Sequence, residues 1–144
     1  MFVDAVVGEK GTGKTPVMLE ILTREAKNEH ANMVFVESGK SASHHIPHSV
    51  RFIDITEYSI QGYDQLLAFI AGMNAKDYDI SHIFIDSVFK IAGDEALESL
   101  ADFINRLEKL ARLVETNITL SLSCAVDELP WLPDSIKIHM PHAN

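Results

Sequence analysis

The sequence predicts an α/β fold in three layers, with a mostly parallel central sheet and helices on both of its faces. Strand-like and helix-like segments alternate along the chain, and the strand-like segments are apolar at nearly every position. Both observations are typical of parallel sheets that helices cover on each side. With 144 residues, 47% of them hydrophobic, and no linker rich in Pro, Gly or Ser, the chain suits one domain over residues 1–144.

The expected elements follow one another in a regular order. Residues 2–7 form a strand that leads through a glycine-rich segment into a helix over residues 14–28, where apolar residues recur at helical spacing. Asp94 is the expected N-cap of a long helix. Residues 38–49 lack periodicity and are expected to form an exposed loop. The other expected strands are 33–36, 50–55, 80–86, 118–123 and 136–139, and the other expected helices are 61–73 and 95–115.

Composition and charge exclude several classes of protein. A net charge of −9 argues against a large non-specific nucleic-acid surface, which needs a basic face. No apolar run reaches the roughly 18–20 residues that span a bilayer. The first residues resemble a strand more than a signal peptide, because Asp4 interrupts them and no basic segment precedes them. The single cysteine, Cys124, cannot form an internal disulfide, which fits a reducing cytoplasm. We expect a cytoplasmic protein without a membrane span.

Residues 8–15 match the pattern G-x-x-x-x-G-K-[ST] of a phosphate-binding loop, between a predicted strand and a predicted helix. Its glycines let the backbone fold around a phosphate, so that N–H groups point inward at the start of the helix. Lys14 brings positive charge to the terminal phosphates, and the Thr15 hydroxyl can bind Mg²⁺. The expected nucleotide-binding residues are Gly8, Glu9, Lys10, Gly11, Thr12, Gly13, Lys14 and Thr15.

Two acidic residues stand at the ends of predicted strands. Asp86 follows three apolar residues, and a carboxylate at that place can bind Mg²⁺ together with Thr15. Glu37 ends the strand of residues 33–36, where it can orient or deprotonate an attacking water. The alternatives are an ordinary turn aspartate and a solvated glutamate at the start of a loop. The pattern predicts a Mg²⁺ site at Thr15 and Asp86, with Lys14 and Glu37 as catalytic residues.

This layout resembles the RecA/RadA–KaiC branch of the P-loop ATPases and so implies the three-layer P-loop NTPase fold. In that branch a strand after the phosphate-loop helix ends in a catalytic glutamate, where Glu37 stands here, and a later strand ends in Asp-Ser, as at Asp86 and Ser87. The branch often has Gln or Asn at the end of the next strand, where this chain offers Ser123 or the Cys124 thiol. The chain also lacks the extra domains and DNA-binding loops of true recombinases, so DNA strand exchange is not expected.

The sequence therefore predicts Mg²⁺-dependent binding and hydrolysis of a nucleoside triphosphate. The absence of an N/T-K-x-D pattern favours ATP over GTP. No charge donor from a neighbouring chain is identifiable, so weak activity is expected unless an oligomer or a protein partner supplies one. The alternatives are a nucleotide-switched binding module without appreciable hydrolysis, a small-molecule kinase with Arg106 and Arg112 as its candidate arginines, and a subunit of an assembly on nucleic acid. Trp131 either packs against the last strand or lines the base pocket.

Overall fold

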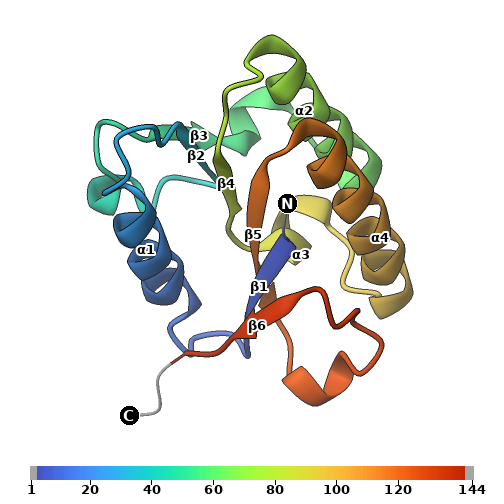
Figure 1. Ribbon diagram of the computed structural model, residues 1–144. Coiled ribbons are helices and arrows are strands. Elements are labelled where there is room, and N and C mark those ends of the chain that lie inside the picture. Colours follow the sequence, from blue (N-terminus) through green and yellow to red (C-terminus); the bar gives the residue numbers. More distant parts are fainter. Residues whose placement is uncertain (1–2, 142–144) are drawn as a thin grey trace.

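The computed structural model describes residues 3–141 (Figure 1). Phe2, the first residue of the first expected strand, and His142 to Asn144 lie outside the described residues. The strands are β1 (Val3–Gly8), β2 (Met33–Glu37), β3 (Arg51–Asp54), β4 (His82–Ile85), β5 (Asn117–Ser123) and β6 (Lys137–His139). The α-helices are α1 (Lys14–Glu25), α2 (Gly62–Lys76), α3 (Val88–Ala92) and α4 (Leu97–Val114).

The six strands form one parallel sheet in the order β3-β2-β4-β5-β1-β6. β5 therefore separates β1, which leads into the glycine-rich loop of residues 8–15, from β4, which leads to Asp86. The register pairs Gly8 with Ser123 and Ile85 with Leu120. Because all strands are parallel, the residues that follow β1, β2, β4 and β5 meet at one edge of the sheet, where ligands of such folds bind.

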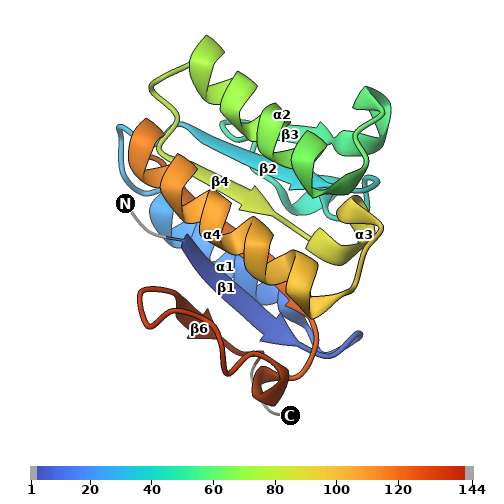
Figure 2. The same cartoon turned by 90° about the vertical axis from the view of Figure 1, so that its right-hand side faces the viewer.

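Helices cover both faces of the sheet, which confirms the predicted three-layer α/β fold. α1 lies on one face, and α2, α3 and α4 lie on the other (Figures 1 and 2). Alternate strand residues face the two layers, as the period of two requires. Phe35 and Phe84 stack on each other beneath α1, with ring centroids 6.2 Å apart, in one apolar cluster. Their neighbours Val34, Val36, Ile83 and Ile85 belong to the larger cluster with α2 and α4.

The long helix α4 begins later than the sequence predicts. The expectation of a helix from residue 95 capped by Asp94 is wrong, because the residue before the first helical residue is Ala96. The Asp94 carboxylate accepts a hydrogen bond from the Ala96 N–H at 2.8 Å, which closes a turn before the helix. Ala96 itself has extended φ and ψ angles of −65° and 128°. Asp94 therefore shapes the entry to the helix without capping it.

Helix α3 is not predicted from the sequence, and some other elements end at different residues than expected. α1 ends at Glu25, three residues before the expected end, and α2 continues to Lys76. α3 is only five residues long, and Ser87 precedes it with a positive φ of 62°. A five-residue helix shows too little periodicity to be recognised from sequence. Through Phe89 and Lys90, this short helix lines a cavity beside the glycine-rich loop.

A chain of polar side chains crosses four neighbouring strands of the sheet, from β4 through β5 and β1 to β6. The Thr119 hydroxyl donates to Asp4 at 2.7 Å, and His139 Nε2 lies 2.8 Å from the other carboxylate oxygen. His82 Nε2 lies 2.7 Å from the Thr119 oxygen. Since Thr119 gives its one proton to Asp4, His82 Nε2 must carry a hydrogen and donate it. Burial lowers the pKa of His82 from 6.5 to about 4, so the ring is neutral at pH 7.

The buried His82 is expected to make the protein sensitive to acid. Its pKa is lower in the folded than in the unfolded state, so below pH 6.5 the unfolded chain binds the proton first. Stability is therefore lost as the pH falls from about 6.5 to about 4, by up to about 3 kcal/mol. Chemical denaturation at pH 7 and pH 4.5 measures the loss. The His82→Phe variant should lose less stability than the wild type over this range, and equal losses would contradict the assignment.

Candidate functional site

The loop of residues 8–15 joins β1 to α1 in a tight turn. Gly11 and Gly13 have φ angles of 81° and 92°, a region that side chains disfavour, so glycine is required at both. The Thr12 N–H and hydroxyl both donate to the Glu9 carbonyl, at 3.2 and 2.6 Å. A Cβ on Gly8 would come within 2.6 Å of the Thr12 oxygen. The loop's fold therefore depends on the glycines that the sequence pattern specifies.

The first turn of α1 lies at the end of this loop with its backbone N–H groups unblocked. Gly13 occupies the N-cap position, and within the described residues no side chain caps the helix and no acidic residue stands in its first turn. A helix start carries free N–H donors and partial positive charge, which favour an anion. Pro16 in the first turn costs no intrahelical hydrogen bond. The start of α1 is thus suited to bind phosphate oxygens.

Lys14 is buried at this point, with 8% of its surface exposed. Its Nζ donates to the Glu9 carbonyl at 3.1 Å, which folds the side chain back over the loop. Burial lowers the pKa of Lys14, and the negative charge of Asp86 counteracts part of that effect. A buried ammonium group with only one hydrogen bond retains donors for a further acceptor. The arrangement places the positively charged ammonium group of Lys14 beside the loop of residues 8–15.

Thr15 and Asp86 meet although 71 residues separate them in sequence. The Thr15 hydroxyl donates to Asp86 Oδ2 at 2.8 Å, and Asp86 is only 3% exposed. A threonine hydroxyl and a carboxylate are hard oxygen donors of the kind that Mg²⁺ prefers. Among residues 3–141 no group of three or more His, Cys, Asp or Glu could hold a metal. Mg²⁺ needs no such group, because it takes one or two carboxylates together with waters and substrate phosphates.

Ser121 is a site residue that is not predicted from the sequence. It lies within β5, fully buried, and its hydroxyl donates to Asp86 Oδ1 at 2.5 Å. A polar residue was expected at the strand end instead, where Ser123 is exposed beside the loop and Cys124 is a buried thiol. Burial raises the pKa of Cys124 to about 11, so the thiol is protonated at pH 7. Polar residues alternate with apolar ones along β5, and Ser121 lies between Leu120 and Leu122 in the part of the strand that pairs with β1. This alternation is the signal that could have directed attention to Ser121.

Glu37 ends β2 at the same edge of the sheet as Asp86. The Asp86 N–H donates to the Val36 carbonyl at 2.9 Å, which fixes the two strand ends side by side. The Glu37 carboxylate is 6% exposed and accepts hydrogen bonds from the Ser41 hydroxyl at 2.5 Å and the Ala42 N–H at 3.1 Å. In this arrangement the side chain is held by the loop that follows its own strand, so its catalytic role stays a prediction.

Cavities lie on two sides of the loop of residues 8–15, and Gly11 and Gly13 contribute to both. The cavity toward β4 has a volume of about 600 Å³ and is lined by Lys10, Gly11, Gly13, Lys14, Thr15, Pro16, Asp86, Ser87, Phe89, Lys90, Glu95 and Ser123. The cavity toward β6 has a volume of about 970 Å³ and is lined by Val7, Gly8, Glu9, Gly11, Thr12, Gly13, Cys124, Ala125, Val126, Asp127, Met140 and Pro141. The loop thus forms a wall between the two cavities, and the lysine side chains that line them, Lys10, Lys14 and Lys90, belong to the cavity toward β4.

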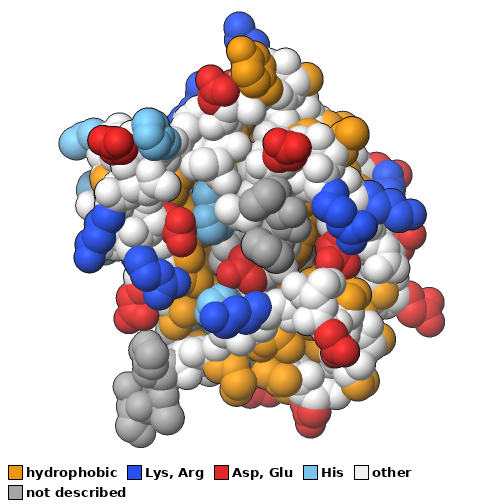
Figure 3. All heavy atoms as spheres, in the orientation of Figure 1, with side chains coloured by type: hydrophobic (Ala, Val, Ile, Leu, Met, Phe, Trp, Pro, Cys, Tyr) orange, Lys and Arg blue, Asp and Glu red, His pale blue; other side chains and the backbone are white. Residues whose placement is uncertain are grey.

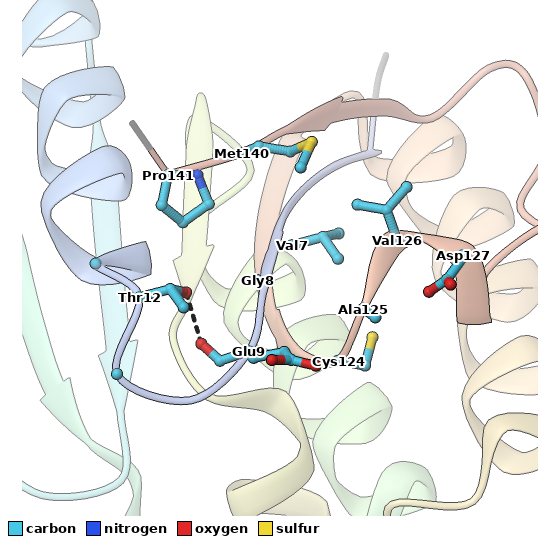
Figure 4. Close-up of a pocket in the computed structure, with 12 residues that line it drawn as sticks. Val7, Gly8, Glu9, Thr12, Cys124, Ala125, Val126, Asp127, Met140 and Pro141 are labelled. Carbon is cyan, nitrogen blue, oxygen red and sulfur yellow. Dashed lines mark hydrogen bonds between the residues drawn. The ribbon is translucent and has the colours of Figure 1, made fainter. Parts of the chain in front are cut away.

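Figure 4 shows how the second cavity is enclosed. Met140 and Pro141, from the segment after β6, stand across from Val126 and Asp127, which belong to the turn after β5. Glu9 and Thr12 of the loop face the same space. The cavity therefore combines apolar side chains with two carboxylates, those of Glu9 and Asp127.

Two residues considered from sequence lie away from these cavities. Arg106 pairs with Asp64 and with Asp102 between α2 and α4. Trp131 is partly buried against the larger apolar cluster and is absent from the described lining of both cavities. Of the two interpretations of Trp131, the structure therefore supports packing.

No protein-family model matches the sequence, and no curated protein matches it either. Among the solved structures, the chain is similar to the pCW3 conjugation coupling protein TcpA in its monomer form with ATPγS, with a TM-score of 0.52 and 15% sequence identity. The similarity covers 84% of this chain and 42% of that chain, so the sequence spans less than half of TcpA. At this identity the likeness concerns the fold alone. Together with the parallel sheet, it shows that the chain shares the three-layer α/β fold of that protein.

Proposed function

We propose that this protein binds Mg·ATP at the loop of residues 8–15 and hydrolyses its terminal phosphate bond. One observation supports the proposal most directly: the Thr15 hydroxyl oxygen lies 2.8 Å from Asp86 Oδ2. Thr15 belongs to the first turn of α1, whose backbone N–H groups are not capped by a side chain. Loop, buried cation and metal-binding carboxylate then stand at one edge of the sheet. Each matches a requirement of phosphoryl transfer, which depends on positioning and charge stabilisation.

The chain's own residues divide this work. The N–H groups of residues 11–15 and the ammonium of Lys14 bind and neutralise phosphate oxygens. Thr15 and Asp86 hold Mg²⁺, which supplies charge neutralisation between the terminal phosphates when bound. Glu37 orients or deprotonates the attacking water once its carboxylate is released from Ser41. The water must come from the side of β2, where Glu37 and Asp86 end neighbouring strands.

The larger cavity is suited to the base and ribose of the nucleotide. It adjoins the loop on the side away from Asp86, and its walls include Val7, Val126 and Met140. Flat aromatic bases bind well between apolar side chains, and a few polar groups then fix their orientation. Asp127 provides a carboxylate for ribose hydroxyls or an exocyclic amino group. Since the chain carries no guanine-reading motif, we assign ATP as the ligand and GTP as the weaker alternative.

The order of elements supports membership in the RecA/RadA–KaiC branch. The elements follow the order of that branch: first β2 with Glu37 at its end, then β3 and α2, then β4 followed by Asp86 and Ser87, and finally the long helix α4 and β5. Ser121, and not Ser123, takes the polar position nearest Asp86.

The surface supports a small-molecule substrate more than a long nucleic acid. Lys and Arg side chains are interspersed with Asp and Glu on the face shown in Figure 3, and the net charge is −9. Within the described residues, no arginine lines the cavity toward β4, where the terminal phosphates would lie. We therefore propose slow turnover by the isolated chain, which a second copy or a protein partner raises by adding a positive charge.

Within residues 3–141, none of the helices meets the length and apolarity needed to cross a bilayer.

The position of the Glu37 carboxylate favours a second candidate function. Because Ser41 and Ala42 hold both of its oxygens, the chain is also suited to bind ATP without appreciable hydrolysis. In that case nucleotide binding would change the loop of residues 38–42 and thereby a partner surface. The two candidates share the ATP site and differ in the role of Glu37.

Thermal unfolding with a panel of nucleotides tests the proposal. ATP, ADP, GTP and AMP are each added with Mg²⁺ and with EDTA. Mg·ATP should give the largest rise in melting temperature, since a ligand at 100 times its Kd adds about 2.7 kcal/mol of stability. AMP, which lacks the terminal phosphates, should have little effect. A panel without any shift, or equal shifts for AMP and ATP, would refute the proposed site.

A further inference from the structure

Asp86 lies deep in the site with both carboxylate oxygens engaged. Oδ2 accepts the Thr15 hydroxyl at 2.8 Å and Oδ1 accepts the Ser121 hydroxyl at 2.5 Å. The two donors come from different elements, α1 and β5, and they hold the carboxylate from two sides. A carboxylate held in this way has one rotamer, so the choice of which oxygen faces Thr15 is fixed by the fold.

Ser121 is itself held on two sides. Its one hydroxyl proton goes to Asp86, and its oxygen accepts the Ser87 N–H at 2.6 Å. Ser87 has a left-handed φ of 62° at the turn out of β4, so its N–H leaves the strand pattern and needs another acceptor. The Ser121 hydroxyl thus closes the turn and at the same time directs the carboxylate. Since Ser121 is fully buried, water cannot replace it easily.

We propose that Ser121 is a positioning residue for Mg²⁺: it holds Asp86 Oδ1 so that Oδ2 is presented to Thr15 and to the metal. This inference rests on the proposed Mg·ATP site. Groups that orient a metal-binding carboxylate typically change metal affinity 10- to 100-fold when they are removed. The Ser121 hydroxyl forms hydrogen bonds with Asp86 and with the Ser87 N–H, and both of these residues line the cavity toward β4. Its effect on the site therefore passes through the turn that carries Asp86.

Thr119 offers a matched control on the same strand. It lies two residues before Ser121, it is also fully buried, and its hydroxyl donates to the carboxylate of Asp4 on the neighbouring strand at 2.7 Å. Thr119→Val therefore removes the same kind of hydrogen bond near the amino ends of the strands, away from the loop. Any general weakening of β5 should affect both variants alike.

The test measures the Kd for ATP with Mg²⁺ and with EDTA in the wild type, Ser121→Ala, Ser121→Thr and Thr119→Val. In Ser121→Ala the Mg²⁺-dependent gain in affinity should fall by about 10-fold or more, while the Kd in EDTA changes less than about threefold. Thr119→Val should keep the full gain. Ser121→Thr retains a hydroxyl and adds a methyl group, so it should keep more of the gain than alanine. A role in packing alone predicts the reverse order.

The possible outcomes separate this inference from the proposed function. If the wild type binds no ATP, the proposed function fails and the inference with it. If Mg²⁺ tightens ATP binding equally in the wild type and Ser121→Ala, only the inference is overturned. If Mg²⁺ has no effect on the wild type, both the metal site and the inference are overturned. Should Ser121→Ala not fold, Ser121→Cys takes its place, because a thiol fills the space but donates weakly.

Discussion

Replacing Lys14 with alanine is expected to weaken Mg·ATP binding by about 30- to 100-fold. The ammonium group is 8% exposed and makes one hydrogen bond, to the Glu9 carbonyl, so it is free to bind phosphate oxygens. Removing a charge-assisted hydrogen bond from a buried site costs about 2–3 kcal/mol, and each 1.4 kcal/mol corresponds to about a tenfold change in Kd. Isothermal titration of ATP with Mg²⁺ into each variant measures the change.

The control is Lys27→Ala, which removes the same charge from the exposed turn after α1. Its Kd should remain within about twofold of the wild type. Thermal unfolding without nucleotide shows whether Lys14→Ala is folded. A folded Lys14→Ala variant that binds Mg·ATP as tightly as the wild type would contradict the assignment of residues 8–15 as the nucleotide site.

Replacing Glu37 with glutamine is expected to lower ATP turnover by about 100-fold or more and to leave ATP affinity within about threefold. General-base catalysis contributes about 10²–10⁴ to a rate, and an amide cannot accept the proton. Glutamine keeps an oxygen for the Ala42 N–H, so the loop after β2 should stay folded. Release of inorganic phosphate under saturating Mg·ATP measures the turnover.

Ser41→Ala serves as the companion variant, because it removes the hydrogen bond that holds Glu37 Oε2. If Glu37 must be released to act, this variant should hydrolyse ATP at least as fast as the wild type. Unchanged turnover in Glu37→Gln would refute the catalytic role. A wild type that binds ATP without measurable turnover would instead support the nucleotide-switched binding module.

The sequence predicted those parts of the molecule that depend on local pattern. The alternation of apolar strands with helices predicted the three layers, and the glycines of residues 8–15 specified the loop whose backbone has the required positive φ angles. The place of Asp86 followed from topology, since parallel strands end at one edge. The structure brings Asp86 to Thr15, as this topology requires, at 2.8 Å.

The parts that the sequence did not predict depend on contacts between distant segments. Ser121 acts on Asp86 only because β5 lies beside β4, and strand order is not visible in the pattern of one strand. The cavity toward β6 depends on Met140 and Pro141 standing opposite the turn after β5. The hydrogen bond from the Ser41 hydroxyl to Glu37 forms in a loop whose sequence has no apolar periodicity. Such features follow from packing, which local propensity does not encode.

The most direct test is an amide chemical-shift titration of the ¹⁵N-labelled full chain with Mg·ATP, inorganic triphosphate with Mg²⁺, and adenosine. If the loop binds the phosphates through its backbone, the N–H signals of residues 9–15 should shift with ATP and with triphosphate alone. Adenosine should leave them unchanged, because it lacks phosphate. Loop signals that stay fixed while ATP shifts residues elsewhere, or while nothing shifts at all, would contradict the proposed phosphate-binding loop.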